Sequence, residues 1–304
     1  MIRLREVSRR FGSLKAVQRL TLEVAQGEIF GLVGPDGAGK TTALRLMAGL
    51  LIPNSGSIHV GGLDVRLEPD RVKDMAGYMA QRFGLYGDLT VEENLAFYGD
   101  LFGVPRNVRQ ALAGELLDMM RLTPFRRRAA AQLSGGMKQK LALACTLLHK
   151  PRVLLLDEPT NGVDPLSRRD FWQILMRLAG EGMTVFMTTA YLDEAERCGR
   201  VALMSAGRIL RCDTPQSLKA ELAPRAFLSA DSSRRAGARL NSTPGVLAAE
   251  PAGAALHVYL SPGASREEVE RASGVRLDPL APSLEDVFIA EMRASRAREA
   301  RHGQ

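Results

Sequence analysis

Short apolar runs alternate with segments of helical periodicity along most of the chain. Strands are predicted at 28–33, 57–60, 75–81, 153–156 and 184–189, and helices at 41–50, within 82–131, from 134 to about 149 and after 164. The run at 153–156 is continuous, as in a strand buried on both faces of a parallel sheet. This alternation predicts an α/β fold with a mostly parallel sheet that holds its ligand at the carboxyl edge.

The two ends of the chain follow a different pattern. Strands predicted at 2–7 and 20–24 flank a loop that contains Arg9, Arg10, Phe11 and Gly12. After Leu222 the composition shifts to Ala, Arg, Ser, Gly and Pro. Further strands at 246–249, 256–260 and 275–277 and a final helix opening at Ser283 follow. We therefore expect a main domain over 1–222, with a helical insert at about 82–148, and a small α+β domain over 223–304.

Composition narrows the class of protein. The chain has 304 residues, 45% hydrophobic and 25% charged, which is typical of a globular protein of one large or two ordinary domains. No apolar run approaches the ~18 residues of a membrane span, and no signal-peptide pattern is present, so the sequence predicts a cytoplasmic protein. The formal charge of +7 predicts an anionic partner: nucleotide, lipid headgroup or nucleic acid.

The cysteines and histidines predict no metal or disulfide framework. The three cysteines form no C-x-x-C pair and are odd in number, which favours reduced thiols. The four histidines are scattered, and none is paired at helical spacing.

A nine-residue segment between a predicted strand and a predicted helix fits the G-x-x-x-x-G-K-[ST] phosphate loop. Its residues are Gly34, Pro35, Asp36, Gly37, Ala38, Gly39, Lys40, Thr41 and Thr42. The glycines let backbone N–H groups point at an anion, Lys40 reaches the β- and γ-phosphates, and the helix N-terminus favours negative charge. Thr41 supplies a hydroxyl for magnesium. The segment predicts binding of a nucleoside triphosphate with Mg²⁺.

Two adjacent carboxylates end the buried run at 153–156. Asp157 and Glu158 are costly to keep charged there without a cation nearby. Beside magnesium and ATP, Asp157 would hold the metal and Glu158 would polarise the water that attacks the γ-phosphate. Gln81, the polar residue that ends the strand at 75–81, fits the same site. A helix-capping Asp-Glu pair is the alternative.

A second glycine-containing segment opens the helix that begins near 134. Ser134 can cap this helix, and Gly135 and Gly136 leave its first N–H groups bare, as an incoming phosphate requires. A flexible turn is the alternative interpretation. Phe11 is open to two readings as well, as a core aromatic or as a ring on which adenine stacks.

These motifs together resemble the ATP-binding cassette (ABC) ATPase subunits, from Ile2 to about Gln216. The resemblance implies the P-loop ABC ATPase fold, a mixed-sheet core with an antiparallel β subdomain and a helical insert. It implies that Phe11 stacks on adenine, that Gln81 links the γ-phosphate and its metal to a membrane partner, and that Asp164 reaches across a dimer interface. In this family two cassettes pair head to tail, and Ser134, Gly135 and Gly136 of one cover the nucleotide of the other.

The C-terminal segment narrows the resemblance to the ATPases of ABC-2-type exporters, including drug-resistance and YbhF-type cassettes. The segment Ser283-Leu284-Glu285-Asp286-Val287-Phe288-Ile289 opens the final helix, and this ending resembles the C-terminal accessory domain of those ATPases. The similarity to YbhF-type cassettes comes from the phosphate loop and the stretches 77–90 and 157–172. The resemblance implies ATP-driven export, multidrug efflux among the options, at the cytoplasmic face of the membrane. The partners would be separate ABC-2 permeases, contacted near Gln81, Phe83 and Tyr86, and a second cassette of the same or a different kind. The cargo stays open.

One position departs from the family pattern. The family places a histidine that bonds the γ-phosphate after the strand at 184–189, and this chain has Ala190 there. Alanine has no donor to offer. We therefore expect a slow site on this chain's own phosphate loop, and an asymmetric pair whose strong site lies on another cassette. Thr189 or Tyr191 substituting for the histidine is the rival explanation.

Two other classes of protein compete with the exporter interpretation. A non-transport ABC protein would use the charge of +7 on nucleic acid or ribosomes, but such relatives carry two cassettes or long coiled-coil inserts. This sequence has one cassette and no sustained heptads, so we expect no nucleic-acid partner. A simple P-loop kinase would leave the segment from Ser134 to Gly136 and the carboxylate of Glu158 unexplained.

Overall fold

The computed structural model describes residues 1–82 and 84–302 and divides the chain into two compact units. The first unit comprises Met1–Ala190 and Met204–Arg208, and the second comprises Tyr191–Leu203 and Ile209–Gln304. The division crosses strands β9 (Arg200–Ser205) and β10 (Arg208–Asp213). The domain boundary expected after Leu222 stays a prediction. In the described residues, no helix has the length and apolar character needed to cross a membrane.

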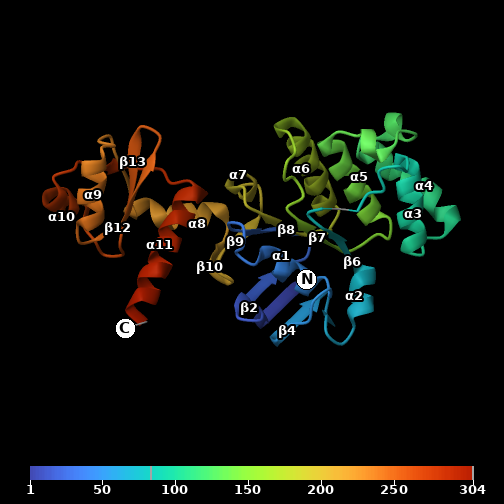
Figure 1. Ribbon diagram of the computed structural model, residues 1–304, viewed down its shortest axis with the longest axis horizontal. Helices are drawn as coiled ribbons and strands as arrows, with labels where there is room; N and C mark the ends of the chain where they lie inside the picture. Colours follow the sequence, from blue (N-terminus) through green and yellow to red (C-terminus); the bar gives the residue numbers. More distant parts are fainter. Residues whose placement is uncertain (83, 303–304) are drawn as a thin grey trace. The chain divides into compact units, whose positions relative to one another are not determined.

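A parallel sheet forms the centre of the first unit (Figure 1). Its parallel strands lie in the order β3 (Ile29–Val33), β8 (Thr184–Thr189), β7 (Val153–Asp157) and β6 (Ala76–Met79), and β9 and β10 continue the same sheet beyond β3. Every residue of β7 and β8 is buried, as the apolar run predicted for a strand covered on both faces. The register pairs Val33 with Thr189 and Asp157 with Thr188, so the carboxyl ends of β3, β8 and β7 meet at one edge.

Helices follow the strands of the first unit, and those between Val91 and Leu147 lie within the region of the expected insert. Thr90 and Glu93 make a reciprocal capping box at the start of α3, and the side chains of Ser134 and Asp164 cap α5 and α6. The helices are α1 (Lys40–Met47), α2 (Pro69–Met75), α3 (Val91–Leu101), α4 (Arg106–Met119), α5 (Gly135–Leu147) and α6 (Pro165–Gly180), with 3-10 turns at Thr123–Phe125 and Ala130–Gln132. The predicted helices at 41–50, at 134–149 and after 164 are confirmed.

An antiparallel sheet makes up the rest of the first unit. Its order is β2 (Leu14–Val24), β1 (Ile2–Phe11), β4 (Ser55–Val60) and β5 (Leu63–Asp64). The loop predicted around Arg9 to Gly12 is wrong as far as Phe11, because β1 continues to Phe11 and pairs it with Leu14 of β2, whereas Gly12 does lie in the turn between the strands. Register shifts along β1 break the alternation of buried and exposed residues, so the sequence pattern hides this strand's second half.

The second unit contains a four-stranded sheet in the order β12 (Val246–Ala252), β13 (Ala255–Leu260), β11 (Ala226–Ser229) and β14 (Asp278–Pro279). The strand predicted at 275–277 is wrong. Val275 and Leu277 are buried in the core, but strand pairing begins only at Asp278. The unit's helices are α7 (Leu192–Ala195), α8 (Pro215–Leu222), α9 (Arg234–Ser242), α10 (Arg266–Ser273) and α11 (Leu284–His302), with a 3-10 turn at Ala223–Arg225.

A buried carboxylate ties α11 to the sheet of the second unit. Asp286 accepts hydrogen bonds from the Tyr259 hydroxyl at 2.7 Å and from the Ser283 backbone N–H and hydroxyl, each at 2.7 Å. His257 Nδ1 lies 2.6 Å from the same carboxylate. Burial would raise the pKa of Asp286, but the hydrogen bonds from Ser283, Tyr259 and His257 outweigh it and lower that pKa. The segment that opens the last helix is therefore both a helix cap and an anchor.

Candidate nucleotide-binding site

The phosphate-loop segment connects β3 to α1 at the carboxyl edge of the parallel sheet. Gly39 caps α1 with φ of 103°, a left-handed conformation that favours glycine. A Cβ on Gly39 would lie 2.1 Å from the Ala16 carbonyl oxygen, and one on Gly34 would lie 2.2 Å from the Met204 carbonyl oxygen. The backbone at Gly34 and Gly39 is therefore packed too closely for a side chain, whereas a Cβ on Gly37 would have no atom within 4 Å. Glycines at these positions are what a phosphate-binding loop requires.

Lys40 is held inside this loop. Only 4% of the residue is exposed, and its Nζ donates to the carbonyl oxygens of Gly34 at 2.7 Å and Pro35 at 3.1 Å. The side chain of Asp36, 96% exposed, lies 4.0 Å from Nζ and points to solvent. The ammonium group is thus fixed where the loop turns around the N-terminus of α1. That is the position from which a lysine can meet the terminal phosphates of a nucleotide.

Asp157 ends β7 beside the first turn of α1. It is 1% exposed, and its Oδ1 accepts hydrogen bonds from the hydroxyls of Thr41 at 3.0 Å and Thr188 at 2.7 Å. A carboxylate and hydroxyls are the oxygen donors that magnesium takes in phosphate-binding sites. The residues therefore fit a magnesium ion, which Thr41 and Asp157 would hold. Thr188 was not predicted as a site residue, since its role depends on the register between β7 and β8.

Glu158 lies at the centre of the polar network. Its Oε1 is 3.0 Å from Lys40 Nζ, and its Oε2 accepts hydrogen bonds from Gln81 Nε2 at 2.8 Å and Asn161 Nδ2 at 3.3 Å. Its backbone adopts φ of 47°, and its N–H donates to Thr188 Oγ1 at 3.0 Å. The unusual backbone angle turns the side chain back toward Lys40 and Gln81. Asn161 was also missed, although its place shortly after the two carboxylates was a usable signal.

The structure therefore brings five predicted residues together within one chain. A carboxylate placed beside a lysine and an amide can accept a proton from a water molecule next to bound phosphate. The five residues are Lys40, Thr41, Gln81, Asp157 and Glu158.

The segment from Ser134 to Gly136 lies at the start of α5. Ser134 Oγ accepts a hydrogen bond from Met137 N at 3.3 Å, as a helix cap does. Gly135 has room, since a Cβ there would lie 3.7 Å from the nearest atom, the Gly162 carbonyl oxygen. A Cβ on Gly136 would lie 2.4 Å from Ser167 Cβ. Close packing of α5 on α6 thus requires Gly136, so this glycine has a structural role whether or not a phosphate binds there.

Asp164 and Phe11, which were also predicted as site residues, contact Ser167 and Arg9 respectively. Asp164 caps α6 by accepting from Ser167 N at 2.9 Å, and this backbone hydrogen bond lowers the pKa of Asp164. Phe11 is 43% exposed at the end of β1, and the Arg9 guanidinium carbon lies 4.7 Å from its ring centroid. Phe11 is therefore no core aromatic. The stacking of Phe11 on adenine stays a prediction. The reach of Asp164 across a dimer interface stays a prediction as well.

Ala190 follows β8 directly and is exposed at the same sheet edge. The Gly34 N–H donates to the Thr189 carbonyl at 3.3 Å, which joins the end of β8 to the start of the phosphate loop. A methyl group thus stands next to the loop where the family has an imidazole. Of the expected permease-facing residues, Phe83 lies outside the described part of the chain. Tyr86 is 47% exposed, with its ring centroid 4.5 Å from that of Phe97.

Comparison with known proteins gives a consistent family assignment. The sequence profile described as ABC transporter matches residues 17–161. The Escherichia coli (strain K12) protein "Probable multidrug ABC transporter ATP-binding protein YbhF" is 43% identical over 297 residues, which cover 95% of this chain and 51% of YbhF. The chain therefore spans about half the length of YbhF.

Two further relatives are covered over more of their own length. The "Daunorubicin resistance ATP-binding protein DrrA3" of Streptomyces coeruleorubidus is 41% identical over 214 residues, covering 70% of this chain and 68% of DrrA3. The "Nod factor export ATP-binding protein I" of Rhizobium etli is 35% identical over 291 residues, covering 93% of this chain and 90% of that protein.

Solved structures agree with the sequence relatives. A structure of the ATP binding subunit of an ABC transporter matches 73% of this chain and 92% of its own, with a TM-score of 0.65 and 26% identity. A dimeric post-hydrolysis structure of an ATP-binding cassette bound to ADP and Pi matches 70% of this chain and 98% of its own, with a TM-score of 0.63 and 27% identity. The mixed sheet, helical insert and phosphate loop are therefore those of the P-loop ABC ATPase fold, and the chain belongs to the ATP-binding cassette family of ABC transporters.

Proposed function

We propose that this chain binds ATP with Mg²⁺, hydrolyses it to ADP and phosphate, and thereby powers an ABC-2-type exporter. The observation that carries the proposal is the network around Glu158, whose two carboxylate oxygens meet Lys40 at 3.0 Å and Gln81 at 2.8 Å. A carboxylate that only capped a helix would not need contacts with a buried lysine and an amide. It suits a residue that must be held beside a phosphate and accept a proton.

The chemistry follows from the roles of these residues. Lys40 and the N–H groups of the phosphate loop bind and orient the triphosphate, and Glu158 accepts the proton of the water that attacks the γ-phosphorus. Gln81 holds the Glu158 carboxylate in place by a hydrogen bond of 2.8 Å, and it would also help to hold the metal. Thr41 and Asp157 would hold magnesium, which when bound neutralises charge on the phosphate oxygens. Phe11 would stack on the adenine.

A second cassette completes the site in this proposal. Ser134, Gly135 and Gly136 of one chain cover the nucleotide on the phosphate loop of the other, and Asp164 reaches across the interface. The dimeric cassette bound to ADP and Pi supports such pairing. The rate of ATP hydrolysis at the site next to Ala190 distinguishes the two possible partners. A slow site favours a different cassette, and a fast site favours a second copy of this chain.

The membrane partners are ABC-2-type permeases, with the chain at the cytoplasmic face of the membrane. Relatives named for multidrug transport, daunorubicin resistance and Nod factor export support this role. The same relatives favour export over an action on nucleic acid. Their cargoes differ from one another, so they do not assign a cargo to this chain.

Phosphate release from Mg-ATP, measured with the purified chain and with its permease partners, tests the proposal. Glu158→Gln should keep ATP binding and lower turnover about 10²- to 10⁴-fold, because the amide cannot accept the proton. Turnover by Glu158→Gln equal to that of the wild type would contradict the assigned chemistry. Co-purification with integral membrane proteins supports the export role, and salt-sensitive sedimentation with RNA in their place would contradict it.

A further inference from the structure

Helices α5 and α6 start next to each other, and each begins at a segment assigned above to the partner's nucleotide. Ser134 caps α5 and Asp164 caps α6. In the first turns, the close approach of Gly136 to Ser167 leaves no room for a Cβ, which would lie 2.4 Å from Ser167 Cβ. The two helix N-termini are therefore presented as one surface.

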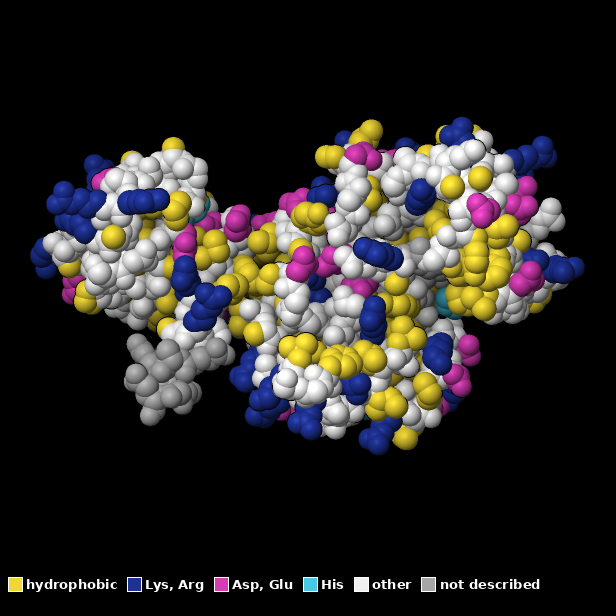
Figure 2. All heavy atoms as spheres, viewed as in Figure 1, with side chains coloured by type: hydrophobic (Ala, Val, Ile, Leu, Met, Phe, Trp, Pro, Cys, Tyr) yellow, Lys and Arg dark blue, Asp and Glu magenta, His cyan; other side chains and the backbone are white. Residues whose placement is uncertain are grey.

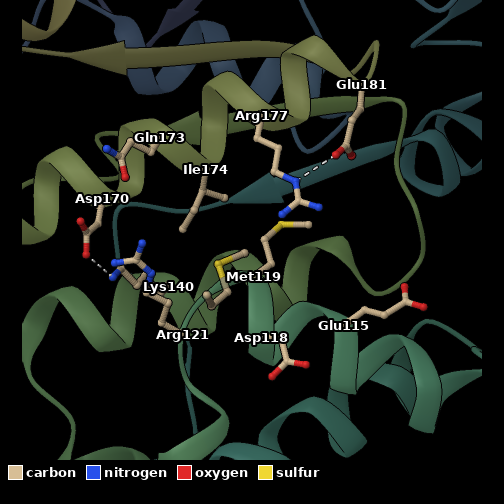
Figure 3. Close-up of a pocket in the computed structure, with 11 residues that line it drawn as sticks. Glu115, Asp118, Met119, Arg121, Lys140, Asp170, Gln173, Ile174, Arg177 and Glu181 are labelled. Atoms are coloured by element: carbon tan, nitrogen blue, oxygen red, sulfur yellow. Dashed lines mark hydrogen bonds and ion pairs between the residues drawn. The ribbon is translucent and has the colours of Figure 1, made fainter.

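An ion pair joins the same two helices one turn further on. Lys140 Nζ lies 3.0 Å from Asp170 Oδ2, and the two side chains are only 11% and 23% exposed. Figure 3 shows Lys140 reaching from α5 across to Asp170 on α6. Because both contacts advance by one turn in the same direction along each helix, α5 and α6 run parallel from their N-termini.

Beyond the ion pair, a hollow of about 720 Å³ lies between α6 and the C-terminal end of α4, with Lys140 of α5 at its edge. Met119 and Arg121 line it from the helical insert, and Ile174 and Arg177 line it from α6 (Figure 3). Arg177 does not bridge the hollow, since its partner at 3.0 Å is Glu181 of the same chain segment. Lys140 and Asp170 both line this hollow, so open space rather than packed side chains adjoins their ion pair.

We infer that Lys140 and Asp170 are positioning residues for the nucleotide held by the partner cassette. Their ion pair fixes the start of α5 relative to the start of α6, and so fixes Ser134, Gly135 and Gly136 relative to Asp164. The inference rests on the proposed function, in which these segments act on the other chain's phosphate loop. The inference predicts that breaking the ion pair in one chain lowers ATP turnover at the phosphate loop of the other chain, and not at its own.

Mixed dimers test this prediction. Lys40→Ala inactivates one phosphate loop, and Lys140→Met is placed either on that chain or on the other, with two affinity tags selecting the mixed dimer. On the same chain as Lys40→Ala, it should lower turnover about tenfold or more, because the remaining live site uses the displaced helix start. When Lys140→Met is on the chain without Lys40→Ala, turnover should equal that of the mixed dimer that carries only Lys40→Ala. Equal losses in both arrangements would overturn the inference.

Two further variants separate positioning from general damage. The reversed pair, Lys140→Glu with Asp170→Lys, should recover most of the lost turnover, since it restores an ion pair between the helices. Arg177→Met removes a cation from the same hollow without touching a contact between α5 and α6, and should change nothing. Failure of the reversed pair to recover, together with a matching loss in Arg177→Met, would contradict the inference.

Amide exchange gives a readout that does not depend on hydrolysis. In Lys140→Met, the N–H groups in the first turns of both α5 and α6 should exchange faster, while those of α1 should not change. Unchanged exchange in both first turns would overturn the inference. If the mixed dimer of wild type and Lys40→Ala hydrolyses no ATP, that result counts against the proposed function. Amide exchange in Lys140→Met would still test the role of the ion pair.

Discussion

Lys40 Nζ lies 3.0 Å from Glu158 Oε1, so the phosphate loop and the carboxyl end of β7 meet in an ion pair. The two side chains are 4% and 10% exposed. Removing one partner of a buried pair leaves the other charge uncompensated, so these positions tolerate change poorly. The same pair places a cation that can meet phosphate next to a carboxylate that can accept a proton.

Ala190→His should speed hydrolysis at the chain's own site. The substitution adds a donor at the end of β8, next to the phosphate loop, and one preorganised donor is worth about 10²- to 10³-fold in turnover. Ala190→Leu, which adds bulk without a donor, is the control. Steady-state phosphate release measures the effect. Fast hydrolysis by the unaltered homodimer, unchanged in Ala190→His, would rule out the asymmetric pair, and Thr189 and Tyr191 substitutions would then show what replaces the histidine.

Phe11→Ala should weaken ATP binding and leave inorganic tripolyphosphate binding unchanged. Stacking of a base on an aromatic ring is worth about 1–3 kcal/mol, so the dissociation constant for ATP should rise about 5- to 150-fold. Phe11→Trp keeps a ring face and should retain affinity. Calorimetric titrations with both ligands distinguish the cases. A parallel loss for ATP and tripolyphosphate would place Phe11 in the fold rather than on the base.

Gly136→Ala should destabilise the chain more than Gly135→Ala. A Cβ on Gly136 would lie 2.4 Å from Ser167 Cβ, whereas one on Gly135 would lie 3.7 Å from its nearest neighbour. Overpacking of this kind costs about 1–3 kcal/mol. Urea unfolding followed by the fluorescence of Trp172, the single tryptophan, measures the difference. Ser167→Gly should rescue Gly136→Ala, and equal stabilities of the two alanine variants would contradict this packing.

Asp286 should make the second unit sensitive to acid. The pKa of Asp286 is lowered on folding, so its contribution is present at pH values above the unfolded pKa of about 3.9 and is lost as the pH falls through the lower, folded pKa. Asp286→Asn should therefore lose about 1–3 kcal/mol at pH 7 and show a flatter decline below pH ~4. Urea unfolding followed by circular dichroism measures this. Glu285→Gln, an exposed neighbour, is the control, and matching curves for both variants would contradict the role of Asp286.

The parallel sheet and its ligand edge could be predicted because their signals are local. A strand, a glycine-rich turn and a helix in succession predict the phosphate loop, and the buried run before Asp157 predicts a central strand. Register carries no such signal. Thr188 and Asn161 become site residues only because β7 pairs with β8 and because Glu158 turns its side chain back. The second half of β1 was lost for a similar reason, since bulges break its alternation.

Titration of Mg-ATP into the purified chain and into Lys40→Ala by calorimetry tests the central claim most directly. The account predicts saturable binding by the wild type and loss of that binding in Lys40→Ala, because the ammonium that meets the terminal phosphates is gone. No heat of binding with the wild type, even with its permease partners present, or binding of equal strength in both proteins, would contradict it.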